Sequence, residues 1–292
     1  MPRLKDEFLE CVIYFYRSEH EAKEGINIGG SGFLVSIPAP EIPGNKSFLY
    51  AVTNRHVLAA GAHFLRWNQA NSGIFVVETK NNDWVSSETD DLAVTPIDPT
   101  GWDTLAHKAI GLDSILSEKI AKEIEFGVGD EVFMVGRFIN AEGKQRNQPT
   151  VRFGNIAQML GEPLHCRIDS KTIIDQYSIL AEIRSIGGYS GSPVMLNELP
   201  FIDRLKTGKT IDKHWLVGID WGHVPMWSPV CGFNEEPIGN GWQVETNTGM
   251  AAIVPAWKLR DLLMTKVLAD ARAAAIAKVL PAKQKPLNSP SE

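Results

Sequence analysis

Short apolar runs separated by turn residues constrain the fold of this chain more than any other feature of its sequence. Of its 292 residues, 25 are glycine and 17 are proline. Runs this short, interrupted this often, are typical of β-strands rather than of helices. Strands that close into barrels leave no exposed sheet edge. The predicted strands lie in residues 8–16, 32–37, 48–53, 73–77 and 91–97 in a first group, and in residues 131–135, 150–156, 177–183, 192–196, 215–221 and 250–254 in a second.

Two segments have helical periodicity instead. Residues 113–124 place their apolar side chains close to one face, and Asp113 or Ser114 can cap the first turn. An apolar stripe and then an alanine-rich stretch predict a C-terminal helix, whose second half either supports self-association or projects into solvent. The predicted organisation is an N-terminal barrel over 8–112, a helical connection over 113–126, a C-terminal barrel over 127–255, a helix over 256–280 and a disordered tail over 281–292.

The charge balance and the cysteines narrow the possible binding partners and the cellular compartment. The formal net charge is −6 and the pI is near 5.7, which argues against a nucleic-acid or an anionic-membrane partner. We find neither a signal peptide nor an apolar run long enough to cross a membrane. Three widely separated cysteines, Cys11, Cys166 and Cys231, favour a reducing cytoplasm, unless they are simply small buried side chains.

A serine enclosed by glycines is the most informative local motif. Residues 188–193 read Gly-Tyr-Ser-Gly-Ser-Pro and follow a predicted strand, so the backbone can turn sharply around Ser190. A serine hydroxyl reacts only with help from a base and an orienting acid. His56 ends the run Thr-Asn-Arg-His, and Asp91 begins the run Asp-Leu-Ala-Val. Each residue alone has an ordinary structural explanation, and Asp90 is an alternative acid.

The three motifs together, in this order, resemble those of the trypsin-like (chymotrypsin-fold) serine peptidases. The Gly-Ser-Pro ending is most similar to the bacterial branch that includes the glutamyl endopeptidases. The resemblance covers about residues 8–265 and implies an all-β fold of two consecutive six-stranded antiparallel barrels with a C-terminal α-helix. It also implies a cytoplasmic bacterial serine endopeptidase that acts on protein or peptide substrates through an acyl-enzyme. It implies no cofactor and no metal.

The same resemblance assigns roles to the motif residues. Ser190 attacks the scissile carbonyl, His56 accepts and returns the proton, and Asp91 orients His56. The backbone N–H groups of Gly188 and Ser190 form the oxyanion hole. Tyr189 stands where digestive relatives have the aspartate that pairs with a newly freed amine, so we expect no activation by cleavage.

Substrate recognition is predicted at two further segments. An extended peptide pairs along Asp220, Trp221 and Gly222. Arg184 lies where the family often has its pocket-floor residue, and a cation there favours an acidic substrate side chain, unless strand alternation turns Arg184 to solvent. The glutamyl branch has a histidine in its pocket wall, whereas Ile219 and Asp220 occupy that stretch here.

Other functions fit the sequence less well. An inactive trypsin-like module that binds protein is the main alternative. An esterase of another fold has its serine before its acid and histidine, whereas Ser190 comes last here. Cys166 and His165 point to opposite faces of a strand and cannot work as a pair. The histidines and cysteines at 165, 166, 214, 223 and 231 lack the spacing of a zinc site.

Overall fold

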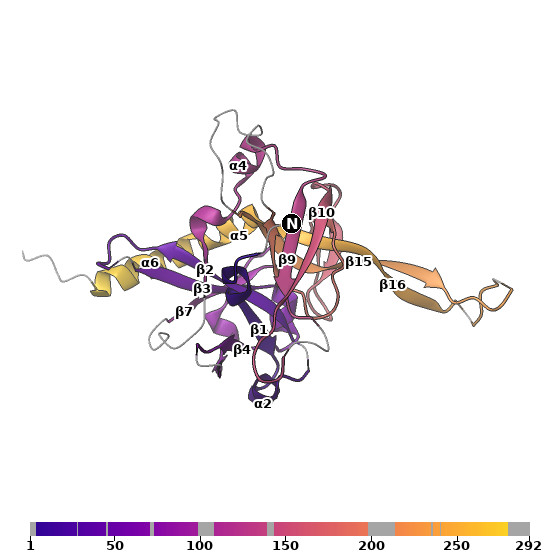
Figure 1. The fold of residues 1–292 in the computed structure, drawn as a ribbon, viewed down its shortest axis with the longest axis horizontal. Coiled ribbons are helices and arrows are strands. Elements are labelled where there is room, and N and C mark those ends of the chain that lie inside the picture. Colours follow the sequence, from indigo (N-terminus) through magenta and orange to yellow (C-terminus); the bar gives the residue numbers. More distant parts are fainter. Residues whose placement is uncertain are drawn as a thin grey trace, which may run out of the picture.

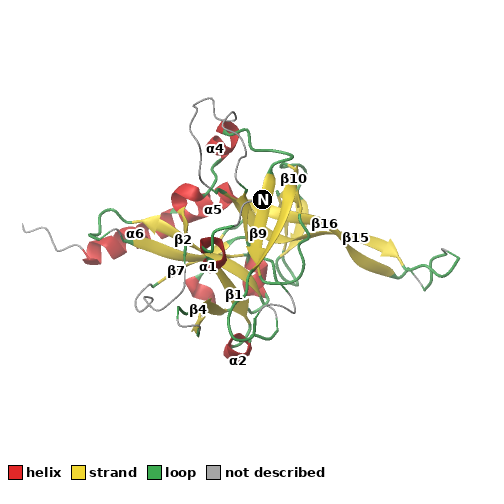
Figure 2. Cartoon of the chain, in the orientation of Figure 1, coloured by secondary structure: helices red, strands yellow, loops and turns green. Residues whose placement is uncertain are grey.

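The protein consists of two β-structures in succession, followed by C-terminal helices. The computed structural model describes residues 4–27, 29–44, 46–70, 73–98, 108–138, 143–197, 214–234, 236–239 and 241–279. Figures 1 and 2 show the two β-structures side by side, with a helix extending from one side of the molecule and a long β-ribbon from the other. The predicted tail over 281–292 lies outside the described residues. In the described part of the chain, no helix is both long and apolar enough to span a membrane.

The first β-structure is a strongly curled antiparallel sheet. Its strands follow the order β5-β4-β1-β2-β3-β7-β6, and the short β8 pairs in parallel with β2. The pairings given by the described residues do not close this sheet into a ring, whereas the sequence predicts a six-stranded barrel. The strands are β1 (Val12–Tyr16), β2 (Gly30–Pro38), β3 (Ser47–Thr53), β4 (Phe64–Asn68), β5 (Ile74–Glu78), β6 (Val85–Ser86), β7 (Ala93–Ile97) and β8 (Ile110–Gly111).

The second β-structure is a closed six-stranded barrel with the strand order β10-β13-β16-β15-β14-β9. The predicted all-β fold, two successive β-structures with a C-terminal helix, is confirmed, although only the second of them is a closed barrel and the first is a curled sheet. A separate hairpin, which the sequence analysis missed, consists of β11 (Leu164–Arg167) and β12 (Ile173–Gln176). The barrel strands are β9 (Glu131–Gly136), β10 (Thr150–Gln158), β13 (Ile179–Glu182), β14 (Pro193–Leu196), β15 (Leu216–Pro229) and β16 (Gln243–Pro255).

Strands β15 and β16 continue well beyond the barrel as a two-stranded ribbon (Figure 1). Val230 donates its N–H to Trp242 O at 3.0 Å. Because antiparallel pairs alternate, the odd-numbered residues of this part of β15 direct their N–H positions away from β16. Pro225 and Pro229 occupy such outward positions, where no donor is needed. The ribbon exposes six large apolar side chains: Met226, Trp227, Phe233, Ile238, Trp242 and Val244.

The N-terminal helices are short. Helix α1 (Glu7–Glu10) occupies the start of a predicted strand, and α2 (Glu19–Glu24) begins where Ser18 Oγ accepts the N–H of Glu21. Helix α3 (Arg55–Ala59) follows β3 directly. The sequence analysis missed both α1 and α2.

The helix predicted over 113–124 is only partly present. Helix α4 spans Glu118–Glu123 and is capped by Ser117, not by Asp113 or Ser114. Ile115 instead forms a bridge with Leu216, and Leu116 donates its N–H to Leu216 O at 3.0 Å. Tertiary pairing with the second barrel therefore overrides the local helical pattern.

The C-terminal helix is divided in two. Helix α5 (Ala256–Leu263) buries Trp257, Leu259 and Leu263 and packs against β15 and β16. Helix α6 (Lys266–Val279) buries only Leu268. Arg272 fastens α6 to the first sheet, because its guanidinium donates to Tyr50 Oη at 3.1 Å and to Leu263 O at 2.9 Å.

Candidate active site

His56 lies in the first turn of α3, at the junction with β3. Thr53 ends β3, and Asn54 has extended backbone angles before the helix begins at Arg55. The side chain of Asn54 donates to Asp91 O at 2.7 Å, which ties the start of the helix to the segment before β7. The imidazole of His56 is about a quarter exposed, so it is held by the fold and still open to a substrate.

The Asp91 carboxylate binds His56 at two points. Oδ2 lies 2.6 Å from His56 Nδ1, and Oδ1 accepts the backbone N–H of His56 at 3.0 Å. The carboxylate is fully buried. Burial alone would lower the pKa of His56, but the charge and hydrogen bond of Asp91, with a smaller contribution from Asp220, raise it above 6.5. Asp90 turns away and accepts hydrogen bonds from Ser87 and Thr89.

The β11–β12 hairpin closes over Asp91. Gln176 accepts the N–H of Asp91 at 2.7 Å through its Oε1, and its Nε2 donates to Asp90 Oδ1 at 3.2 Å. The thiol of Cys166 donates to Asp91 Oδ2 at 3.6 Å. Burial, together with the neighbouring Asp91, raises the pKa of that thiol far above its usual range. The sequence analysis missed both contacts, because nothing local to Cys166 or Gln176 indicates which distant segment each one meets.

Two glycines and a buried tyrosine shape the loop around Ser190. Gly188 and Gly191 have φ of +95° and +89°, which other residues rarely adopt. The side chain of Tyr189 is fully buried; its hydroxyl contacts Thr150 Oγ1, and Arg152 lies 5.1 Å from the centre of its ring. The loop is therefore anchored in the second barrel by Tyr189.

The first β-structure holds the same loop from the other side. Ser31 donates two hydrogen bonds to this loop. Its backbone N–H binds Ser190 O at 2.8 Å, and its hydroxyl binds Gly188 O at 2.7 Å. A Cβ atom at Gly30 would lie 2.8 Å from a methyl of Val57 and 3.2 Å from Ser190 O. The start of β2 is thus in contact with both the Ser190 loop and the residue after His56.

The hydroxyl of Ser190 is directed at the neighbouring strand. It donates to Trp221 O at 3.4 Å, and among the described residues no hydrogen bond joins it to His56. The structure therefore pairs His56 with Asp91 and places the Ser190 loop close to the start of α3. The hydroxyl of Ser190, however, is hydrogen-bonded to Trp221 O and not to His56. The N–H groups of Gly188 and Ser190 make no hydrogen bond within the described part of the chain, so both remain available as donors.

The predicted substrate strand begins inside the barrel. Asp220 exchanges backbone hydrogen bonds with the loop, because its carbonyl accepts the N–H of Gly191 at 2.8 Å and its N–H donates to Ser192 O at 3.0 Å. Trp221 donates its indole N–H to Ser178 Oγ at 2.9 Å. A Cβ atom at Gly222 would meet nothing within 4 Å, so the surface beside it is open.

Arg184 does not face this site. Its side chain is exposed, and the residues on either side of it, Ile183 and Ser185, are buried. The solvent-facing alternative for Arg184 is therefore what the structure shows. Ser185 takes the inward position and donates its hydroxyl to Asp220 Oδ2 at 2.7 Å, a contact that the sequence analysis did not foresee.

The remaining alternatives lead to no second cluster in the described structure. Cys166 is buried, whereas His165 is exposed beside Asp175, so this pair does face opposite sides of β11. Cys231 is exposed near the tip of the ribbon, which corrects the expectation that all three thiols are buried. Within the described ranges, no three His, Cys, Asp or Glu side chains gather where they could hold a metal ion.

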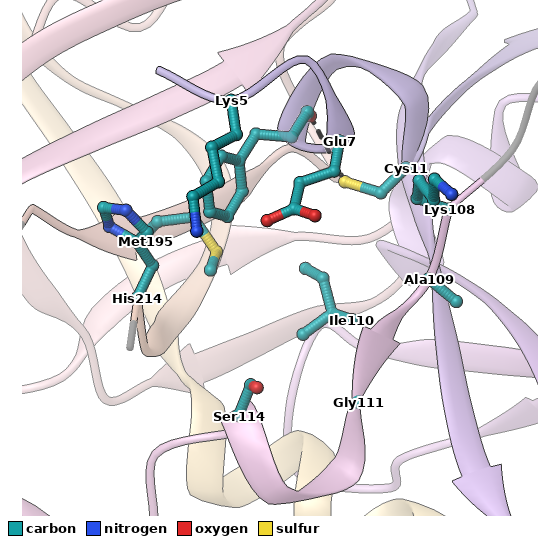
Figure 3. A pocket seen from close by; sticks show the side chains of 11 residues that line it. Lys5, Glu7, Cys11, Lys108, Ala109, Ile110, Gly111, Ser114, Met195 and His214 are labelled. Carbon is teal, nitrogen blue, oxygen red and sulfur yellow. Dashed lines mark hydrogen bonds between the residues drawn. The ribbon is translucent and has the colours of Figure 1, made fainter. Parts of the chain in front are cut away.

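A cavity separate from these residues lies beside α1. Figure 3 shows Lys5, Glu7 and Cys11 on one side of it and Ile110 and Ser114 on the other. None of the residues predicted for the active site lines this cavity.

The chain is similar to several solved proteases in arrangement. No protein-family model matches it, and no curated protein matches it. The MamO protease domain from Magnetospirillum magneticum is 16% identical with a TM-score of 0.49, covering 90% of this chain and 100% of that one. The active form of the Rv3671c protease from M. tuberculosis is 13% identical (TM-score 0.40; 80% and 71% covered). The serine protease domain of the Sesbania Mosaic Virus polyprotein is 13% identical (TM-score 0.41; 88% and 94% covered).

Proposed function

We propose that the protein is a serine endopeptidase with Ser190 as nucleophile, His56 as general base and Asp91 as the orienting acid. The observation that carries this proposal is the double contact between Asp91 and His56, at 2.6 Å to the imidazole Nδ1 and 3.0 Å to the backbone N–H. A buried carboxylate on Nδ1 fixes the tautomer that leaves Nε2 free to accept a proton. The resemblance of the three motifs to trypsin-like peptidases supports the same assignment.

The reaction would proceed in two halves. Ser190 Oγ attacks the scissile carbonyl carbon while His56 Nε2 takes the hydroxyl proton, and the carbonyl oxygen becomes an oxyanion facing the N–H groups of Gly188 and Ser190. His56 then gives the proton to the leaving amine as the C–N bond breaks, so the amine product departs and the acyl group stays on Ser190 Oγ. Water next attacks the acyl carbon while His56 takes its proton. The ester C–Oγ bond breaks, His56 returns the proton to Ser190 Oγ, and the carboxylic acid product leaves.

Substrate binding would itself prepare the nucleophile. In the free protein the Ser190 hydroxyl donates to Trp221 O. A peptide that pairs with the strand at Asp220–Gly222 would place its own N–H on that carbonyl. The hydroxyl would then lose its acceptor and could rotate towards His56, which completes the catalytic group only when substrate is present.

Labelling with a fluorophosphonate probe tests this proposal directly. We expect stoichiometric labelling of the intact chain that is lost in Ser190→Ala and falls by at least about 10³-fold in rate in His56→Ala. Folding of both variants is checked by their unfolding transitions. An intact, folded protein that neither reacts with the probe nor cleaves a denatured protein substrate would overturn the assignment.

A second candidate function is a trypsin-like module that binds protein without cleaving it. The orientation of Ser190 favours this candidate, because a hydroxyl held on Trp221 O is not poised for attack. The probe separates the two functions. A module that binds peptide would show unchanged affinity in Ser190→Ala and no labelling in the parent chain.

The setting and the partners remain part of the proposal. The three free cysteines support a reducing cytoplasm, the resemblance of the Gly-Ser-Pro motif supports a bacterial origin, and the proposed activity implies a protein or peptide as substrate. Self-association through α6 is supported by its exposed side chains, since Val267 and Val279 are both more than half exposed. Sedimentation of the chain with and without residues 266–292 tests this contact.

A further inference from the structure

The outer edge of β16 in the ribbon has backbone groups that no strand covers. Strand β13 pairs with β16 only from Met250 onwards, and among the described residues no strand continues this pairing towards the tip. Val230 donates its N–H to Trp242 O, so the alternation of an antiparallel ladder directs the N–H and C=O groups of Gln243 and Glu245 away from β15. The outward positions of β15 include prolines, whereas this edge keeps both donors and acceptors.

One face of the ribbon is mainly apolar. Residues directly opposite each other on paired strands share a face. The members of this face are Met226, Ser228 and Val230 of β15, opposite Thr246, Val244 and Trp242. The side chains of Met226, Trp242 and Val244 are each about half exposed or more. Large apolar side chains gathered on a projecting surface mark a site of protein–protein contact.

The charges at the two ends of the ribbon are complementary. No lysine or arginine occurs between residues 215 and 257, and the acidic Glu236 is exposed in the turn at the tip. The base of the ribbon lies beside a cation, because Asn247 Nδ2 donates to Ser185 O and the neighbouring Arg184 is exposed. Two ribbons that run in opposite directions would therefore bring an acidic tip towards a basic base at both ends.

We propose that two copies of the chain associate through the β16 edges of their ribbons, antiparallel and about a two-fold axis beside Val244. The two Val244 residues then lie opposite each other, and Gln243 of each copy lies opposite Glu245 of the other. A two-fold axis makes the same surface serve both copies. This contact goes beyond the proposed peptidase function and does not depend on it.

The side chains select this register. Gln243 and Glu245 form the hydrogen-bonded pairs on either side of the axis, and the amide of Gln243 can also donate to the carboxylate of Glu245. Within each copy, Glu245 Oε1 already binds His223 Nε2 at 2.9 Å, which reduces the cost of bringing two acidic ribbons together. An axis beside Glu245 would instead oppose two carboxylates, which is unfavourable. With the axis beside Val244, the two apolar faces join into one.

Cross-linking through a cysteine introduced at Val244 tests the register. Residues opposite each other in a non-hydrogen-bonded pair have Cα atoms about 4.5 Å apart, a separation that a disulfide can span. In a Cys231→Ser background, which removes the exposed thiol of the ribbon, we expect Val244→Cys to form a disulfide-linked dimer on mild oxidation. Ser228→Cys, the matched control, should stay unlinked, because it lies on the same face but on the strand away from the axis.

Sedimentation over about two decades of concentration measures the association itself. We expect the intact chain to shift reversibly from monomer to dimer, and the shift to be lost when an Asn-Gly turn replaces residues 227–245. Arg184→Glu should raise the dimer dissociation constant at least about tenfold, because the reversed charge acts at two symmetric contacts. Adding Glu236→Lys to that variant should restore most of the association.

Several results would overturn this inference. One is a chain that stays monomeric at every concentration, and another is a dimer that survives shortening of the ribbon. Equal cross-linking of Val244→Cys and Ser228→Cys would show that the ribbons do not meet through their β16 edges. An Arg184→Glu variant that associates as well as the parent would contradict the antiparallel arrangement. The parent chain needs no substitution for sedimentation, and no measurement here needs a reactive Ser190, so failure of the peptidase function leaves this test intact.

Discussion

The thiol of Cys166 and the imidazole of His56 meet on one oxygen of Asp91. Asp91 Oδ2 lies 2.6 Å from His56 Nδ1 and accepts a hydrogen bond from the Cys166 thiol at 3.6 Å. Cys166 comes from the β11–β12 hairpin, which is not part of either barrel. This hairpin therefore fixes the orientation of a carboxylate that belongs to the first β-structure.

Replacing Cys166 by alanine should lower kcat about fivefold with little change in KM, the effect of losing one hydrogen bond of about 1 kcal/mol. The thiol partly neutralises Asp91 Oδ2, so its loss should also raise the kinetic pKa of His56. Rate against pH measures both effects. Cys11→Ala is the matched control, since this buried thiol donates to Phe8 O away from the site. Equal effects in the two variants would contradict a positioning role for Cys166.

Replacing Gln176 by leucine should destabilise the protein by about 1–3 kcal/mol, because the buried N–H of Asp91 loses its acceptor. The free energy of unfolding in urea gives the size of the effect. Gln158→Leu, at an exposed position of β10, serves as the control. We expect Gln176→Leu also to slow labelling of Ser190. A variant as stable as the parent would show that the contact contributes nothing.

The rate with a neutral substrate should fall as the pH is lowered through a pKa above 6.5. His56 accepts a proton only when it is neutral, and Asp91 and Asp220 raise its pKa. Removing one negative charge in Asp220→Asn should move this acid limb to lower pH. Because Asp220 itself ionises near pH 7, the parent profile should be broader than that of the variant. An acid limb that moves to higher pH would contradict the arrangement.

Replacing Tyr189 by alanine should cost about 3–5 kcal/mol of stability, as expected for truncation of a large buried ring. Tyr189→Phe removes only the hydroxyl that contacts Thr150 and should cost about 1 kcal/mol. Tyr177→Phe, at a half-exposed site, is the control for loss of a hydroxyl. Unfolding in denaturant ranks the three variants. An unchanged stability in Tyr189→Ala would show that the loop is held by other contacts.

Shortening the ribbon should leave the rest of the protein intact. Met226 pairs with Thr246 and lies at a position whose N–H faces β16, so an Asn-Gly turn can replace residues 227–245 without disturbing the register. The ribbon beyond this pair is exposed, and we expect the free energy of unfolding to change by no more than about 0.5 kcal/mol. A large loss of stability would show that the ribbon packs on the body.

The sequence analysis predicted five strands of the first β-structure and all six of the second barrel, because each is a short apolar run between turn residues, but it missed β4, β6 and β8. It failed where tertiary contacts override local pattern. Ile115 and Leu116 belong to the helical pattern of residues 113–124, yet in the structure both pair with Leu216. The ribbon was missed because Pro225 and Pro229 look like breakers, although their alternate spacing lets a strand continue past them.

The candidate site was predictable to the extent that its residues belong to local motifs. His56, Asp91 and Ser190 each sit in a short run that can be read in the sequence. Ser185 was not predicted, because the sequence analysis considered only Arg184, one residue earlier, as the residue of this segment that could face the pocket, and left open whether it does. Gln176 and Cys166 act on Asp91 from a hairpin more than seventy residues away, and no periodicity connects such distant positions.

The two prolines of the ribbon, Pro225 and Pro229, also limit how a strand of a neighbouring molecule can pair with its edge. Along the outer edge of β15, Trp227 retains the only outward amide donor between Pro225 and Pro229. A foreign strand would find carbonyls there but almost no amide hydrogens to bond with. The ribbon can thus expose its apolar side chains to solvent while its β15 edge resists strand-by-strand polymerisation.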